Sequence, residues 1–114
     1  MSQNIPWEDS FNAAVTIIGR DFTILYMNEK AAGIFERWGG KALIGKDVRA
    51  CHQERSIHIM ERIFETGVPN VYTIEKKGVK KLIYQAPWRR DGEIAGLVEL
   101  SMELPFDMPH YVRE

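Results

Sequence analysis

One segment of helical periodicity, residues 54–66, lies between two groups of short strand-like segments, and it constrains the fold more than any other feature. At about 100° per residue, its apolar and charged side chains fall on opposite sides of the helix. The apolar side consists of Ile57, Ile59, Met60, Ile63 and Phe64. Gly67 and then Pro69 end the helix. A helix with one apolar side has to pack that side against another element, and the predicted strands offer the surface for it.

The strand-like segments before and after this helix predict five strands. Residues 14–18 and 23–27 are rich in β-branched and apolar residues and are joined by a short turn, which predicts a hairpin. Residues 71–75, 80–87 and 94–103 follow the helix, with turns at Lys77-Gly78 and Asp91-Gly92. Alternation puts two sets of side chains on one face each: Leu82, Tyr84, Ala86 and Trp88, and Gly96, Val98, Leu100, Met102 and Leu104.

The segment between the hairpin and the long helix predicts shorter helical elements. Asn28 is a good N-cap for a short amphipathic helix that Gly39-Gly40 ends, and residues 41–48 predict irregular turns. The order of elements predicts an α+β fold with a five-stranded antiparallel sheet and helices that cover one face. We expect a lead-in over residues 1–11, one domain over residues 12–104 and a tail over residues 105–114.

Composition excludes several classes of protein. Fifteen Lys and Arg against sixteen Asp and Glu give a net charge of −1, which argues against a nucleic-acid binder. Four lysines on one hairpin are interpreted as residues that keep its edge solvated: Lys76, Lys77, Lys80 and Lys81. A single Cys cannot form an internal disulfide. With neither an apolar run of membrane length nor a signal-peptide pattern, we expect a cytoplasmic protein without a membrane partner.

Three stretches of the chain carry a resemblance to one protein family. Residues 23–32 look like a strand followed by an Asn-capped helix, here Asn28. Residues 42–46 are similar to a turn between short helices, and residues 91–98 look like a last hairpin with a Gly, here Gly96, early in the final strand. In this order they resemble a PAS domain, a small sensor module of signalling proteins. A departure is Pro105 and Pro109, which stand where many members continue into a signalling helix.

The resemblance implies a non-catalytic sensory module that binds a small apolar or planar ligand between helices and sheet, a protein partner, or both. The residues we place near this cavity are Phe35, Cys51, Met60, Phe64, Tyr84, Val98 and Leu100. One alternative is a ligand-free module for dimerisation and interaction. The other is a small cone-shaped α+β isomerase or hydratase, but such folds open with long helices, whereas this chain opens with a hairpin. No phosphate loop, nucleophile elbow or telling carboxylate pair points to an enzyme.

The resemblance also names three cofactors, and the residues argue against each. Flavin-binding members carry a reactive Cys three residues after a Gly, in a motif that is absent here. The third residue after Gly45 is Val48. A cinnamate-like chromophore on Cys51 needs a Tyr and a Glu where Met27 and Ala31 stand. Cys51 is interpreted as a small buried apolar residue instead.

Haem-binding members ligate iron through a His on the longer helix. His58 lies at the centre of the polar side of the predicted helix, so it should point to water. His52 precedes the helix and is the remaining haem-ligand candidate, while no recognised metal-ligand spacing is present.

The aromatic residues near the ends of elements predict a homodimer. Trp7 and Phe11 in the lead-in are placed to pack on the uncovered sheet face, either in the same chain or across a two-fold axis.

Overall fold

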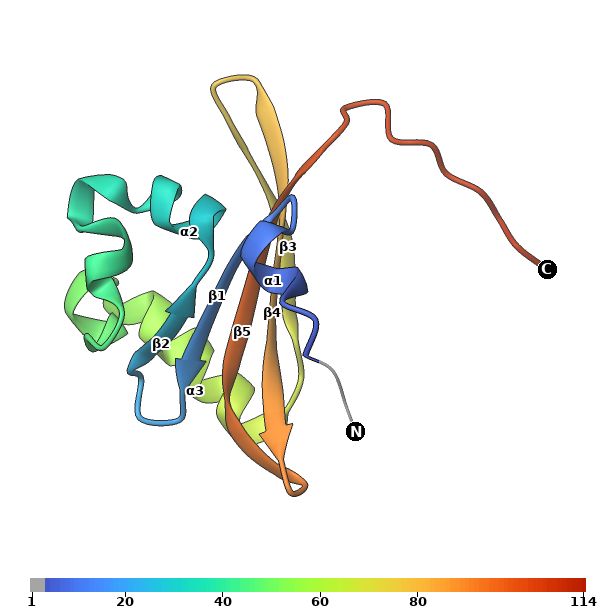
Figure 1. Cartoon of the computed structure of the whole chain (residues 1–114). Coiled ribbons are helices and arrows are strands. Elements are labelled where there is room, and N and C mark those ends of the chain that lie inside the picture. The colour runs from blue at the N-terminus through green and yellow to red at the C-terminus, as the bar shows by residue number, and fades with distance from the viewer. Residues whose placement is uncertain (1–3) are drawn as a thin grey trace.

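The computed structural model describes residues 4–114, apart from the side chain of Cys51, and confirms the α+β fold with one five-stranded antiparallel sheet (Figure 1). The strand order is β2-β1-β5-β4-β3. The strands are β1 Ala14–Gly19, β2 Ile24–Met27, β3 Asn70–Lys76, β4 Val79–Arg90 and β5 Glu93–Leu104. Because β5 pairs with both β1 and β4, the last strand of the chain lies at the centre of the sheet.

The helices lie on both sides of this sheet but in unequal amounts. The segment between β2 and β3 forms α2 Glu29–Ile34, the long α3 Glu54–Thr66, and three 3₁₀ turns at Glu36–Trp38, Gly40–Leu43 and Val48–Cys51. These elements lie on one side of the sheet, which we call the helix-covered face (Figure 1). The short α1 Trp7–Ser10, which the sequence analysis did not predict, lies on the other side, the open face.

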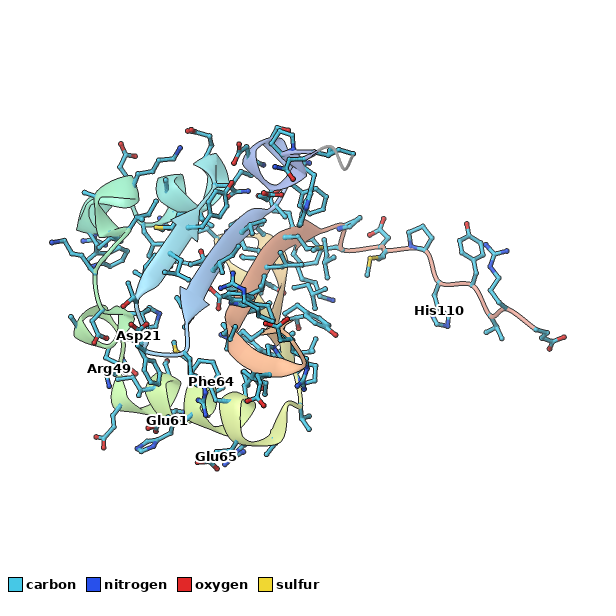
Figure 2. All side chains as sticks on the ribbon, turned by 60° about the horizontal axis from the view of Figure 1, so that its bottom comes forward. Asp21, Arg49, Glu61, Phe64, Glu65 and His110 are labelled. Carbon is cyan, nitrogen blue, oxygen red and sulfur yellow. The ribbon has the colours of Figure 1, made fainter. Side chains whose placement is uncertain are left out.

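The apolar side of α3 faces the sheet, as predicted. Met60, Ile63 and Phe64 are buried, and Ile57 and Ile59 pack partly buried against the same core. Figure 2 shows Phe64 on the side of α3 toward the sheet, with Glu61 and Glu65 on the opposite side. The predicted bounds of this helix, 54–66, agree with the structure, and Gly67 adopts the left-handed conformation that ends it.

Asn28 joins three elements through its side-chain amide. Its Oδ1 accepts from the backbone N–H of Ala31, which caps α2 as predicted, and from the N–H of Val15 in β1, at 3.0 Å each. Its Nδ2 donates to the carbonyl oxygens of Ala13 at 2.8 Å and Glu8 at 2.9 Å. The side chain is buried with all these bonds made, so α1, β1 and α2 meet at one fixed point.

The register confirms which strand residues share a face but corrects the side on which they lie. Leu82 pairs with Met102, Tyr84 with Leu100 and Ala86 with Val98. These pairs lie on the open face, because their neighbours Gln85, Leu97 and Glu99 line the cavity on the helix-covered face. The more apolar face of the sheet is therefore the one that points away from α3.

The two ends of the chain leave apolar side chains in solvent. Trp7 and Phe11 form an edge-to-face pair with ring centroids 5.4 Å apart, yet they are 52% and 43% exposed. Residues after 104 run away from the sheet, with Phe106, Met108, Tyr111 and Val112 exposed (Figure 1). Within residues 4–114, no helix has the length and apolar character needed to cross a bilayer.

Candidate functional site

A small cavity lies between the helix-covered face and the helices, and we call it the core cavity. Its volume is about 40 Å³, enough for a few water molecules. Mostly apolar residues line it, from β1, β2, β4 and β5 on one side and the helical segment on the other. They are Thr16, Ile18, Ile24, Met27, Phe35, Leu43, Val48, His52, Met60, Gln85, Leu97 and Glu99.

A larger hollow of about 300 Å³, the side groove, adjoins the core cavity along the helix-covered face. The residues that line the side groove but not the core cavity include Tyr72, Ile74, Lys81, Ile83 and Ser101. Six residues line both hollows: Thr16, Phe35, His52, Met60, Gln85 and Glu99. We call these six residues the mouth. The core cavity and the side groove therefore meet at the mouth.

A row of polar side chains crosses the sheet at the mouth. Asn70, Gln85, Glu99 and Thr16 are direct register partners from β3 to β1. Asn70 Nδ2 donates to Gln85 Oε1 at 2.8 Å, and Gln85 Nε2 donates to Glu99 Oε1 at 2.7 Å. A carboxylate only accepts hydrogen bonds, so Glu99 dictates the orientation of the Gln85 amide, and Gln85 in turn that of Asn70.

The mouth carries the negative charge of the Glu99 carboxylate. Tyr72 lies on β3, which β4 separates from the strand of Glu99, and the pKa of Tyr72 is raised, first by burial and then by the negative charge of Glu99. Glu99 is the one acidic residue among the described residues that line either hollow.

The two histidines near α3 have different environments. His58 is exposed, with its Nε2 3.5 Å from Glu54 Oε1 and its Nδ1 3.2 Å from Glu61 Oε1. The prediction that this side chain points to water is confirmed. His52 is half-buried at the mouth, with its Nδ1 3.0 Å from the carbonyl oxygen of Val48. A carbonyl oxygen only accepts, so Nδ1 carries the proton. Among the described residues, which leave out the side chain of Cys51, no group of three or more His, Cys, Asp or Glu is arranged to hold a metal ion.

The turn between β1 and β2 is fastened to α3 by stacked aromatic and guanidinium groups. The rings of Phe22 and Phe64 meet edge to face, with centroids 5.5 Å apart. The guanidinium carbon of Arg20 lies 4.6 Å from the ring centroid of Phe64, and that of Arg49 lies 4.7 Å from the ring centroid of Phe22. Hydrogen bonds from Arg49 hold the pKa of Asp47 below its ordinary value. Figure 2 shows Arg49 and Asp21 at the end of the domain where this turn meets α3. This contact closes the end of the core.

The predicted cavity residues have four different outcomes. Phe35 and Met60 line the core cavity. Phe64 is buried against Phe22 and is not among the lining residues. The side chain of Cys51 lies outside the described residues, so its prediction is not tested.

The cavity position predicted for Tyr84, Val98 and Leu100 is wrong, because the register puts them on the open face. Sequence reasoning missed the residues that occupy the opposite face at the same level, Gln85 and Glu99. The signal was present, since both residues alternate with the apolar set. Polar residues in a strand are normally interpreted as solvent-facing, however.

Comparison with known proteins shows to which family this fold belongs. The family model for the PAS fold matches residues 9–104. No curated protein matches the sequence.

Three solved structures illustrate the similarity. A sensory box sensor histidine kinase from Vibrio cholerae has 16% identity and a TM-score of 0.65, with 86% of each chain covered. The PAS domain of the histidine kinase ThkA has 20% identity and a TM-score of 0.66, covering 79% of this chain and 97% of that one. The Vibrio cholera VqmA-ligand-DNA complex has 15% identity and a TM-score of 0.67, covering 86% of this chain and 49% of that one. The solved structures share the fold, and the family model matches most of the chain. This chain therefore belongs to the PAS fold family.

Proposed function

We propose that this PAS domain is a non-catalytic sensory module that holds a small planar ligand at the mouth between α3 and the sheet. The observation that carries the proposal is the continuity of the two hollows at six residues, with Phe35 and Met60 on the helical side and Gln85 and Glu99 on the sheet. Apolar walls with a few convergent polar groups are the usual composition of a small-molecule site.

Native mass spectrometry of the freshly purified chain, combined with a visible absorption spectrum, tests this proposal. We expect a mass above that of the polypeptide, which unfolding in acid reduces to the polypeptide mass as the ligand leaves. A ligand-free mass that persists after incubation with cell extract would contradict the proposal and favour the ligand-free interaction module. A Soret band would instead make haem the ligand, with His52 as the first residue to substitute.

We further propose that the sensory module works as a homodimer through its open face. The support is the distribution of apolar surface: Tyr84 is 39% exposed and Val71 49% exposed at paired positions of the open face. The half-exposed pair of Trp7 and Phe11 belongs to the lead-in, whose α1 lies on this same side of the sheet. Exposed aromatic and aliphatic side chains that gather on one face are typical of an interface between copies.

Sedimentation equilibrium at micromolar concentration tests the dimer. Tyr84→Glu places a charge at the centre of the open face and should give a monomer, whereas Val68→Glu adds the same charge at a 63% exposed position in the loop after α3. The control should keep the mass of the wild type. A wild-type protein that sediments as a monomer, or a Tyr84→Glu variant that remains a dimer, would overturn this interface.

A further inference from the structure

The carboxylate of Glu99 has accepting capacity left at the mouth. A carboxylate offers about four lone-pair directions. Among the described residues Glu99 accepts one hydrogen bond, from Gln85 Nε2 at 2.7 Å. The residue itself is half-buried. A half-buried carboxylate with one donor gains from a second partner that brings positive charge or an N–H group.

The neutral partners of Glu99 cannot supply that charge. Gln85 is held by Asn70, and the whole row of register partners is uncharged apart from Glu99 itself. The row therefore fixes the carboxylate in place without neutralising it. The polar row thus orients an anionic acceptor toward the space between the sheet and the helices.

The wall on the helical side of the mouth suits a flat ring. Phe35 and Met60 come from the α2 and α3 side and line both hollows together with Glu99. An aromatic face attracts cations, and a thioether packs favourably against the edge of an aromatic ring. A planar group between these side chains and the sheet would have apolar contacts on its faces and a carboxylate at its edge.

The cationic groups that face the side groove lie away from Glu99 or are already hydrogen-bonded. Lys81 is four residues from Gln85 along β4, which separates the two positions by about 13 Å of strand. Lys76 lies at the last position of β3, next to the β3–β4 turn. His52 has its Nδ1 at the carbonyl of Val48. A ring-sized ligand at the mouth thus meets Glu99 before it meets either lysine.

We propose that the mouth binds a small planar organic cation, such as an aromatic amidine or a protonated heterocyclic amine, with Glu99 as the residue that recognises its charge. The inference rests on the proposed function, because it assigns a ligand class to the same hollow. Ligands of this class place N–H donors in the plane of the ring, where the carboxylate accepts them, and leave both faces of the ring for Phe35 and Met60.

Three isosteric probes of different charge test the ligand class: benzamidine, benzamide and benzoate. Binding is measured by calorimetry and located by nuclear Overhauser effects between each probe and the methyl group of Met60. We expect benzamidine to bind at least about tenfold more tightly than benzamide, the ratio given by one charge-assisted hydrogen bond. Benzoate should bind more weakly than either at the mouth.

A matched pair of variants assigns the preference to one carboxylate. Glu99→Gln keeps the shape of the side chain and should abolish the preference for benzamidine. Glu103→Gln removes the same charge four residues along β5, outside the mouth and the side groove, and should keep it. Overhauser effects to Met60 in the wild type locate the probe at the mouth without any variant.

The outcomes separate the inference from the proposed function. Equal binding of benzamide and benzamidine, or a preference that survives in Glu99→Gln, would overturn the ligand class while leaving the mouth as a ligand site. Benzoate binding that depends on Lys81 would do the same. Failure of all three probes to reach Met60 would count against the ligand site itself, and so against the proposed function.

Discussion

Trp88 reaches across the central strand to Ile18. Its indole N–H donates to the carbonyl oxygen of Ile18 at 3.1 Å, from β4 to β1, and passes over β5 at Gly96. Gly96 pairs with both Trp88 and Gly19, so it lies directly beneath this contact. A Cβ atom at Gly96 would stand 2.0 Å from the Ile18 oxygen and 2.5 Å from the indole nitrogen. Only a glycine fits at this position, because any side chain would overlap the backbone of β1 and the indole ring of Trp88.

Substitution of Gly96 by Ala should therefore destabilise the domain. The added methyl group has to displace backbone rather than a flexible side chain, so we expect a loss of at least about 3 kcal/mol in the free energy of unfolding. Urea unfolding followed by tryptophan fluorescence measures it. Gly33→Ala is the control, because a Cβ atom in α2 meets nothing within 4 Å, and this variant should be unchanged or slightly more stable. Equal midpoints for the two variants would contradict the close approach.

Asn28→Ala should loosen three elements at once. It removes four hydrogen bonds from a side chain that is 1% exposed and leaves buried backbone groups of Val15 and Ala13 unpaired. We expect a loss of about 3 kcal/mol or more in stability. The specific readout is amide exchange: the N–H of Val15 should exchange faster in the variant under native conditions.

The control for this variant is Asn12→Ala, at an exposed position of the lead-in. It should leave both stability and the exchange of Val15 close to the wild type. If Asn28→Ala exchanged at Val15 no faster than Asn12→Ala, the role of Asn28 as the common joint would be wrong.

The sequence predicted the elements well where periodicity and end signals agree. For α3, the apolar period and the stop at Gly67 together define both ends. Four residues of α1 are too few to show a period, and no side chain caps that helix, so it was missed. The strands at 70–76, 79–90 and 93–104 were predicted one to three residues too short at their ends, because turns such as Lys77-Gly78 leave the last pairs undefined.

Half of the mouth could be predicted and half could not, for a physical reason. A helix has one apolar side, so Met60 had to point into the core. A strand has two faces, and a period of two shows which residues share a face but not which face the helices cover. Here the more apolar face is the open one. Tyr84 and Leu100 were consequently assigned to the cavity, and no role was predicted for Gln85 and Glu99.

Met60→Asp tests the burial of the helix side of the mouth. The side chain is 5% exposed and packs in the core, so a carboxylate there would be unpaired. We expect a loss of about 4 kcal/mol in stability, measured by thermal or urea unfolding. Met60→Leu keeps an apolar side chain of similar volume and should cost less than about 1.5 kcal/mol. A Met60→Asp variant that melts with the wild type would mean that α3 turns another side to the sheet.

Stability at alkaline pH should depend on Tyr26. Partial burial and then the hydrogen bond to Asp9 raise the pKa of this tyrosine from 10.0 to about 12. The folded state thus keeps a proton that the unfolded state loses at lower pH. The contribution of Tyr26 to stability is therefore complete below pH 10 and disappears as the pH rises from 10 to about 12. Because Asp9 belongs to α1, the lead-in should detach in the same interval.

A tyrosinate absorbance titration of the wild type and of Tyr26→Phe measures this effect. The difference between the two curves should be a single ionisation step near pH 12. Tyr111→Phe removes a hydroxyl from the exposed tail and should leave that step in place. Asp9→Asn removes the charged acceptor and should move the step toward lower pH, because a neutral amide holds the phenolic proton less strongly. A step near pH 10 in the wild type would show that Asp9 does not hold the Tyr26 hydroxyl.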